Sequence, residues 1–349
     1  MGEKVRVLVV DDSFLMRRII TDIIDSDPEL EVVGKAKDGD EALEKAASLK
    51  PDVITLDINL PVKDGIEVLQ ELVKKQPTRV IMLSAYTRAG ATATMRALEL
   101  GAVDFIAKPA GEISLGLDKL RSEIVSKIKL AAKIDFDKYL SSFQATPAPV
   151  VEEIKPAGIR KLVIIGASTG GPKAVLDIMK DIPADIPASF LIVQHMPKGF
   201  TMSFAERIGW QSGIRTKEAE SGDRIAPCRA LVAPAGSHMV VDRKDGEIAV
   251  FLTQDPLVNF VRPAIDMTML SAAEIFGRNI LGVILTGMGK DGMEGCRKIK
   301  EKGGRVIVQD EESSVVWGMP RSVVKEGLAD AVLPLSQIAA AIVNMAQQP

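Results

Sequence analysis

The chain of 349 residues contains little cysteine, little histidine and few aromatic side chains. Its two cysteines, Cys228 and Cys296, form no C-x-x-C pair and offer no disulfide framework, so we expect a protein of the reducing cytoplasm. Histidine also occurs only twice, as His195 and His238. Any reaction that requires an imidazole base therefore has to use one of these two side chains.

A long apolar run and a dominant charge are also missing. The first apolar segment, Val5 to Val10, stops at Asp11, which is too early for a signal peptide or a membrane span. The 44 basic and 47 acidic residues give a formal net charge of −3, and no basic helix-turn-helix pattern is present. We therefore expect neither nucleic-acid binding nor direct insertion into a membrane.

The sequence does contain an alternation of strand-like and helix-like segments, and this alternation occurs twice. The length exceeds the roughly 150 residues of one domain, and the alternation dissolves between Asp135 and Gly158 among several prolines. We predict a first domain at residues 1–130, a linker at 131–158 and a second domain at 159–349. Each alternation predicts a doubly wound parallel sheet, so the expected fold class is α/β.

Five segments of the first domain have the length and apolar character of strands. Helices should lie between them, with caps at either Asp12 or Ser13, at Asp38 and at Asp64. Such a domain is expected to be flavodoxin-like, with strand order 2-1-3-4-5. The second domain is expected to be Rossmann-like with a β-rich middle. The expected strands include residues 5–10, 31–34, 53–56, 80–83 and 103–107 in the first domain and 230–233, 247–252 and 305–308 in the second.

Acidic residues follow two strands of the first domain that should be neighbours. Asp11 and Asp12 follow the first strand, and Asp57 follows the third. Three converging carboxylates repel one another unless a cation is present, and hard oxygen ligands suit Mg²⁺. Ser84 and Lys108 follow the fourth and fifth strands, and a hydroxyl and an ammonium group there would suit phosphoryl transfer to a carboxylate.

Together these residues resemble the receiver domain of two-component response regulators, over residues 4 to about 125. The resemblance implies that Asp57 accepts the phosphoryl group and that Phe105 is the switching aromatic residue. One departure is conservative: Leu60 stands where the family usually has methionine before the proline. The matching motifs are Leu8-Val9-Val10-Asp11-Asp12-Ser13, Asp52-Val53-Ile54-Thr55-Leu56-Asp57, Ser84-Ala85 and Lys108-Pro109. The implied metal ligands are Asp11, Asp12, Asp57 and the Asn59 carbonyl, and the implied phosphoryl contacts are Ser84 and Lys108.

A serine, a histidine and an aspartate follow three strand-like segments of the second domain. Ser168 lies in the G-x-S-x-G pattern of residues 166–170, with Pro172 in the first turn of the next helix. His195 follows residues 190–193, and Asp291 lies in a glycine-rich loop after residues 281–285. The carboxyl ends of parallel strands meet at one edge of a sheet, so these side chains could form a nucleophile, a base and an orienting group.

Each of these features also has another interpretation, and a lone histidine at a strand end such as His195 is more often structural than catalytic. A glycine-rich turn can serve close packing or bind a phosphate, and Asp291 can cap the helix that begins near Met293. An α/β-hydrolase places its acid before its histidine, which here would require His238 with an acid such as Asp223. The second domain could also be a non-enzymatic adaptor controlled by phosphorylation.

The second domain resembles the chemotaxis protein-glutamate methylesterase and glutamine deamidase family over residues 160 to about 340. That family also has an amino-terminal receiver domain and a linker. The motifs that match are Gly166-Ala167-Ser168-Thr169-Gly170-Gly171-Pro172, Gln194-His195-Met196-Pro197-Lys198-Gly199-Phe200-Thr201, Arg262-Pro263, Leu285-Thr286-Gly287-Met288-Gly289-Lys290-Asp291-Gly292, Gln309-Asp310-Glu311 and Gly318-Met319-Pro320.

This resemblance implies a function for the whole chain. Ser168 would attack the methyl ester of a receptor glutamate, His195 would take its proton, and Asp291 would orient the imidazole. Backbone amides near Met288 or at Gly170 would meet the oxyanion, and this half would need no metal or organic cofactor. The implied partners are the cytoplasmic region of methyl-accepting chemotaxis receptors and a chemotaxis histidine kinase. The receiver domain would restrain the esterase until it is phosphorylated. A receiver-controlled hydrolase of another substrate stays an open alternative.

Overall fold

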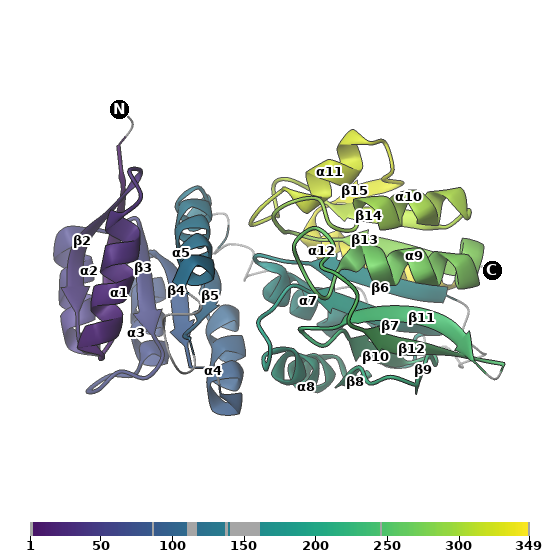
Figure 1. Ribbon diagram of the computed structural model, residues 1–349, viewed down its shortest axis with the longest axis horizontal. Coiled ribbons are helices and arrows are strands. Elements are labelled where there is room, and N and C mark those ends of the chain that lie inside the picture. The colour runs from purple at the N-terminus through teal and green to yellow at the C-terminus, as the bar shows by residue number, and fades with distance from the viewer. Residues whose placement is uncertain are drawn as a thin grey trace. The chain divides into compact units, whose positions relative to one another are not determined.

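The computed structural model describes residues 3–85, 87–109, 117–136, 139, 161–244 and 246–347. The chain divides into two compact units, Met1–Gln144 and Ala145–Pro349, which we describe separately (Figure 1). Most of the predicted linker, at 131–158, lies outside the described residues. The boundaries 1–130, 131–158 and 159–349 therefore stay a prediction.

The first unit is one parallel sheet of five strands in the order β2-β1-β3-β4-β5, as predicted. Its central strands are apolar because helices accompany the sheet, and every residue of β3 is buried. The strands are β1 (Val5–Val10), β2 (Leu30–Ala36), β3 (Val53–Asp57), β4 (Arg79–Ser84) and β5 (Asp104–Ala107). The helices are α1 (Phe14–Asp25), α2 (Gly39–Leu49), α3 (Gly65–Lys75), α4 (Arg88–Glu99) and α5 (Leu117–Ala132).

Side-chain caps fix where four of these helices begin, and the sequence predicted three of the caps. Of the two candidates before α1, Ser13 is the cap, and its hydroxyl accepts a hydrogen bond from the Met16 amide at 3.3 Å. Asp38 and Asp64 cap α2 and α3, as predicted. Since a cap satisfies amides that the first helical turn leaves without partners, these residues set the length of each preceding strand-to-helix loop.

The second unit contains a parallel sheet of seven strands in the order β15-β14-β13-β6-β7-β10-β8, so the doubly wound prediction is confirmed. The β-rich middle of the chain divides between two sheets: β10 joins this sheet, whereas β12 belongs to an antiparallel sheet in the order β11-β12-β9. The strands of the large sheet are β6 (Lys161–Ala167), β7 (Ala188–Gln194), β8 (Arg215–Glu218), β10 (Arg229–Val232), β13 (Ile280–Ile284), β14 (Arg305–Gln309) and β15 (Ala331–Leu333). Those of the small sheet are β9 (Asp223–Arg224), β11 (His238–Lys244) and β12 (Glu247–Thr253).

Helices pack against both sheets of the second unit. They are α7 (Gly171–Lys180), α8 (Thr201–Ser212), α9 (Ile265–Phe276), α10 (Met293–Glu301), α11 (Met319–Lys325) and α12 (Leu335–Gln347), with a 3₁₀-helix η3 (Gly277–Asn279) after α9. Helix α9 follows β12 and precedes β13 in the sequence, and it packs on α10 and β11 (Figure 1). Its buried residues Ile265 and Met269 join strands β6 and β13 in one apolar core.

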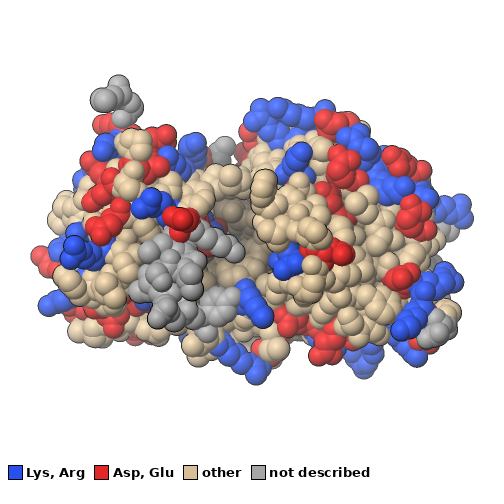
Figure 2. Space-filling view, in the orientation of Figure 1, with Lys and Arg blue, Asp and Glu red and all other residues tan. Residues whose placement is uncertain are grey.

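Charged side chains of both signs are interspersed over the visible faces of the two units (Figure 2), in line with the small net charge. Among the described residues, no helix has the length and apolar character needed to cross a bilayer. Cys228 and Cys296 are both free thiols, and Cys296 is buried.

Candidate functional site

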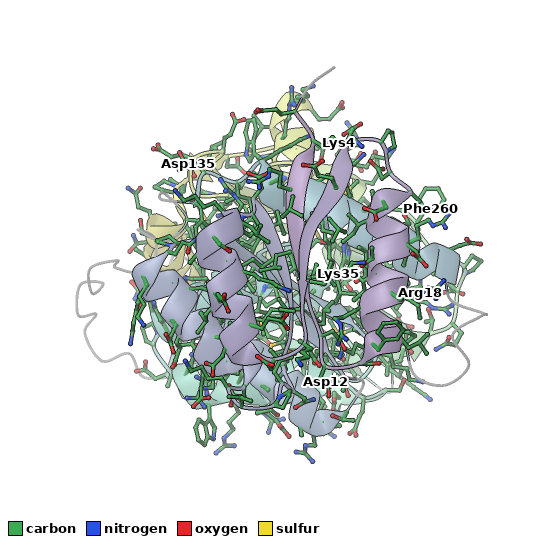
Figure 3. The ribbon with its side chains drawn as sticks, turned by 90° about the vertical axis from the view of Figure 1, so that its left-hand side faces the viewer. Lys4, Asp12, Arg18, Lys35, Asp135 and Phe260 are labelled. Atoms are coloured by element: carbon green, nitrogen blue, oxygen red, sulfur yellow. The ribbon has the colours of Figure 1, made fainter. Side chains whose placement is uncertain are left out.

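Three carboxylates of the first unit converge at the carboxyl ends of β1 and β3. One oxygen from each of Asp11, Asp12 and Asp57 lies within 4.8 Å of the others. Figure 3 shows Lys4 and Asp12 at opposite ends of β1, so the cluster lies where the strand leaves the sheet. Asp11 and Asp57 are buried, and Asp57 Oδ1 has no hydrogen-bond partner among the described residues. Such a donor set fits a hard divalent cation such as Mg²⁺.

Lys108 is the cation that faces this cluster. Its ammonium nitrogen lies 2.8 Å from a carboxylate oxygen of Asp11 and 2.8 Å from one of Asp57. Burial raises the pKa of Asp57, although the neighbouring ammonium works against this effect. Burial alone would lower the pKa of Lys108, but its bonds to Asp11 and Asp57 outweigh it and raise that pKa. The ammonium therefore stays charged and holds the two carboxylates together.

The other predicted residues of this site follow or line neighbouring strands. Ser84 ends β4 beside Asp57 and is completely buried. Phe105 lies buried in β5, and the Lys127 ammonium lies 5.2 Å from the centre of its ring. Asn59 follows β3 and is exposed. The sheet thus brings the hydroxyl, the ammonium and the carboxylates to one edge, as the sequence predicted.

In the second unit, Ser168 and His195 follow the adjacent parallel strands β6 and β7. Asp291 lies in the loop between β13 and α10, and β13 pairs with β6 on its other side. His195 Nε2 lies 2.8 Å from Asp291 Oδ2. The Ser168 amide donates to the Thr286 carbonyl at 3.0 Å, which ties the serine to the loop that carries Asp291. Three distant parts of the sequence therefore meet at one edge of the sheet.

The Asp291 carboxylate accepts hydrogen bonds on both oxygens. Oδ2 accepts the Ile265 amide at 2.7 Å in addition to His195. Oδ1 accepts the Asn259 side-chain amide at 3.1 Å, the Gly292 amide at 3.1 Å and the Asp266 amide at 3.2 Å. Burial alone would raise the pKa of Asp291, but the bond to His195 and these donors together lower it.

Helix α9 supplies two of these donors. Ile265 and Asp266 are its first residues, so the positive end of the helix faces the carboxylate. The helix N-terminus and the imidazole both favour the ionised form of Asp291. The arrangement can hold a histidine in one orientation and stabilise it when it gains a proton.

Comparisons with known proteins show which family this chain belongs to. A family model described as CheB methylesterase matches residues 163–342, and one described as response regulator receiver domain matches residues 7–117. A protein-glutamate methylesterase/protein-glutamine glutaminase of Pyrococcus horikoshii is 46% identical over 347 residues, which cover 99% of this chain and 94% of that relative. This chain belongs to the CheB methylesterase family.

Two further comparisons cover the same family. The protein-glutamate methylesterase/protein-glutamine glutaminase of Thermotoga maritima is 47% identical over 341 residues, which cover 98% of each chain. The crystal structure of the CheB methylesterase catalytic domain of Thermotoga maritima covers 53% of this chain and 98% of that chain, with 44% identity and a TM-score of 0.52. The first unit is accordingly a receiver domain and the second a CheB methylesterase domain.

Two backbone amides of the methylesterase domain, one in the turn after Ser168 and one next to Gly287, have no acceptor among the described residues. Gly170 has φ of 74° and immediately precedes α7, and Met288 is 57% exposed in the loop after β13. No hydrogen bond from either amide is found within the described part of the chain. By contrast, the Gly171 amide already donates to the Ser168 carbonyl at 2.8 Å. Gly170 and Met288 therefore stay the candidates for binding an oxyanion.

His238 has a different environment from His195. It is fully buried, its Nδ1 accepts the Ala264 amide at 3.1 Å, and its Nε2 donates to the Pro256 carbonyl at 3.1 Å. Asp223 lies elsewhere, paired with Lys217 at 3.0 Å. His238 and Asp223 therefore do not form the base and acid pair that the residue order of an α/β-hydrolase would require. Both nitrogens of His238 instead hold backbone in place.

The sequence did not predict Asn259 or the first amides of α9 as partners of Asp291. These donors lie 25 to 32 residues before the aspartate, in an irregular turn and a helix start. The sequence motif nearest to these donors is the Arg262-Pro263 pair, which belongs to the matching motifs but does not by itself predict a contact with Asp291. The alternative role of Asp291 as a helix cap is not what the structure has, since Gly292 occupies the cap position of α10.

Proposed function

We propose that this chain removes methyl groups from glutamate methyl esters, and ammonia from glutamine side chains, on methyl-accepting chemotaxis receptors. The observation that carries the proposal is the 2.8 Å bond between His195 and Asp291, formed next to the strand end that carries Ser168. Membership of the CheB methylesterase family supports the reaction class. The substrate would be the cytoplasmic region of the receptors, reached by a cytoplasmic enzyme that binds no nucleic acid and inserts in no membrane.

The roles in the proposed triad follow from which imidazole nitrogen is engaged. Because Nε2 of His195 is bonded to Asp291, Nδ1 is the nitrogen that would take the Ser168 proton. No partner of that nitrogen is found among the described residues, so it is available to the serine. Asp291 would hold the ring in this tautomer and stabilise the imidazolium.

The reaction would then proceed in two halves. The Ser168 oxygen bonds to the ester carbonyl carbon while its proton passes to His195, and the tetrahedral oxyanion meets the amides of Gly170 and Met288. Each such donor contributes about 3 kcal/mol. Methanol leaves with the proton from His195, and water attacks the acyl-enzyme by the same route to restore glutamate. A glutamine amide would release ammonia in place of methanol.

The receiver domain would control this reaction through Asp57. In the proposal, Asp11, Asp12, Asp57 and the Asn59 carbonyl hold Mg²⁺, which when bound neutralises charge around the acceptor carboxylate. A chemotaxis histidine kinase would donate the phosphoryl group to Asp57, and Ser84 and Lys108 would contact it. The position of Ser84 and the face of Phe105 would then change, which releases the restrained esterase. We take the receiver as residues 1–130, the linker as 131–158 and the esterase as 159–349.

The test is methanol release from methyl-labelled receptors by the full chain in the presence of a phosphodonor. Ser168→Ala and His195→Ala should each lose nearly all turnover, and the double variant should lose little more, because neither group works without the other. A chain that acts as an adaptor would retain its output in Ser168→Ala. Normal turnover of folded His195→Ala would remove this triad from consideration.

A further inference from the structure

A tight turn immediately before α9 contacts the proposed triad. Val258 and Val261 exchange backbone hydrogen bonds of 3.3 and 3.0 Å, and the two residues between them, Asn259 and Phe260, have φ of 51° and 64°. Positive φ at both central positions is the geometry of a type I′ turn, which asparagine tolerates and phenylalanine does not favour. The Phe260 side chain (Figure 3) is 95% exposed. The turn therefore presents one side chain to solvent and the other to the site.

The Asn259 side-chain amide lies between two carboxylates. Its Nδ2 donates to Asp266 Oδ2 at 2.9 Å and to Asp291 Oδ1 at 3.1 Å. The two acids are buried close together, since the Asp266 amide also donates to Asp291. Burial, with the charge of Asp291 adding to it, raises the pKa of Asp266 to about 6. One amide group thus satisfies two carboxylates that would otherwise repel each other.

Asn259 and His195 both donate side-chain hydrogen bonds to Asp291, and the Asp266 carboxyl also lies within hydrogen-bonding reach of it. The remaining donors to this carboxylate are backbone amides. A side chain on Oδ1 fixes the rotation of the carboxylate, and that rotation decides whether Oδ2 faces His195 Nε2. The positive φ of Asn259 places the amide where this contact can form.

We propose that Asn259 is a positioning residue of the esterase, which holds Asp291 so that its Oδ2 stays on His195 while the same amide group bridges Asp291 and Asp266. This inference rests on the proposed triad and adds a residue to it. Asn259 touches no reacting atom, so its loss should lower kcat and leave KM unchanged. The expected decrease is about 10- to 100-fold, the usual effect of a lost hydrogen bond to a charged group.

The turn offers a matched pair of variants in the full-length protein. Asn259→Gly removes the amide and suits the positive φ, so the backbone should keep its path. Phe260→Gly makes the same kind of change one residue later and removes no hydrogen bond to Asp291. Asn259→Asp keeps the shape but puts a third carboxylate against Asp266 and Asp291, so its kcat should fall below that of Asn259→Gly.

Two measurements decide the question. Methanol release from methylated receptors gives kcat and KM, and proton NMR follows the hydrogen on His195 Nε2 that is bonded to Asp291. Asn259→Gly should lose kcat and shift or broaden that signal, whereas Phe260→Gly should change neither. If Asn259→Gly keeps the parent kcat and signal while Ser168→Ala is inactive, the positioning role is wrong and the triad stands. If Ser168→Ala retains turnover, the proposed function itself fails.

Discussion

Gly287 lies so close to Ser168 that an added methyl group should displace the proposed nucleophile. A Cβ at position 287 would lie 2.8 Å from Ser168 Cβ, 3.1 Å from the Ser168 amide and 2.5 Å from Met319 Sδ. Carbon atoms in contact are normally about 3.5–4.0 Å apart, so Gly287→Ala requires a shift of roughly 1 Å. The backbone at Gly287 cannot easily move by this distance, because its carbonyl accepts hydrogen bonds from the amides of Gly318 and Met319 at 3.1 and 2.8 Å.

The effect on catalysis should exceed the effect on stability. A misplacement of about 1 Å in a catalytic group costs roughly 100-fold in rate, and overpacking of a tight site costs about 1–3 kcal/mol in the free energy of unfolding. Met319 is buried but flexible, so part of the clash can be relieved on its side. We therefore expect Gly287→Ala to fold, with a kcat for methanol release about 100-fold below that of the parent.

Gly289 provides the control, two residues further along the same loop. It has φ of 88°, and a Cβ there would have no atom within 4 Å. Gly289→Ala should therefore cost about 1–2 kcal/mol of backbone strain without moving Ser168, and its kcat should stay near the parent value. Urea unfolding of both variants gives the stability and steady-state methanol release gives kcat. A folded Gly287→Ala with a kcat within about threefold of the parent would refute the reasoning.

Three other predictions address the receiver domain and the acid next to the triad. Phosphate incorporation from a small phosphodonor with Mg²⁺ should disappear in Asp57→Asn, and undiminished label would place the acceptor elsewhere. Because burial raises the pKa of Asp266 from 3.8 to about 6, folding favours its protonated form, and the contribution of this group to stability should fall by at most about 3 kcal/mol as the pH rises from about 4 to about 6. In urea unfolding, the stability of Asp266→Asn should rise more, or fall less, with pH than that of the parent, and an identical pH dependence would contradict the assignment. A fragment that begins near Val151 should exceed the unphosphorylated full chain in turnover by about 5- to 150-fold and ignore phosphodonors. A folded fragment no faster than the parent would mean that the receiver does not act by restraint.

Local patterns predicted most of the fold. The strands of the receiver domain are short, largely apolar segments that end at or just before a polar residue, and three helices begin at a side-chain cap that the sequence identified or narrowed to two residues. The carboxyl ends of parallel strands share one edge, which is why the clustering of Asp11, Asp12 and Asp57 followed from their positions. The same reasoning placed Ser168 and His195 at the carboxyl ends of strands in one sheet, and in the structure these two strands are adjacent.

The hydrogen bonds that irregular backbone segments make could not be predicted from these local sequence patterns. The donors to Asp291 come from a turn with two positive φ values and from the first amides of a helix without a side-chain cap. Neither feature has a period or a fixed spacing to Asp291 in the sequence. The division of the middle segments between two sheets also depends on tertiary pairing, since β10 and β12 look alike as apolar segments.

The two buried aspartates at the centres of the two sites differ in how completely their oxygens are satisfied. Asp291 accepts bonds on both oxygens and its pKa is lowered, whereas Asp57 has one oxygen without a hydrogen-bond partner in the described part of the chain and its pKa is raised by burial. A carboxylate that only orients an imidazole gains from every donor that fixes its rotation. A carboxylate that is to accept a phosphoryl group needs an oxygen that no donor occupies, and it retains the cost of its burial until a cation or the phosphoryl group arrives. The contrast fits the roles proposed for the two aspartates, with Asp291 as a fixed support in one domain and Asp57 as a reactive acceptor in the other.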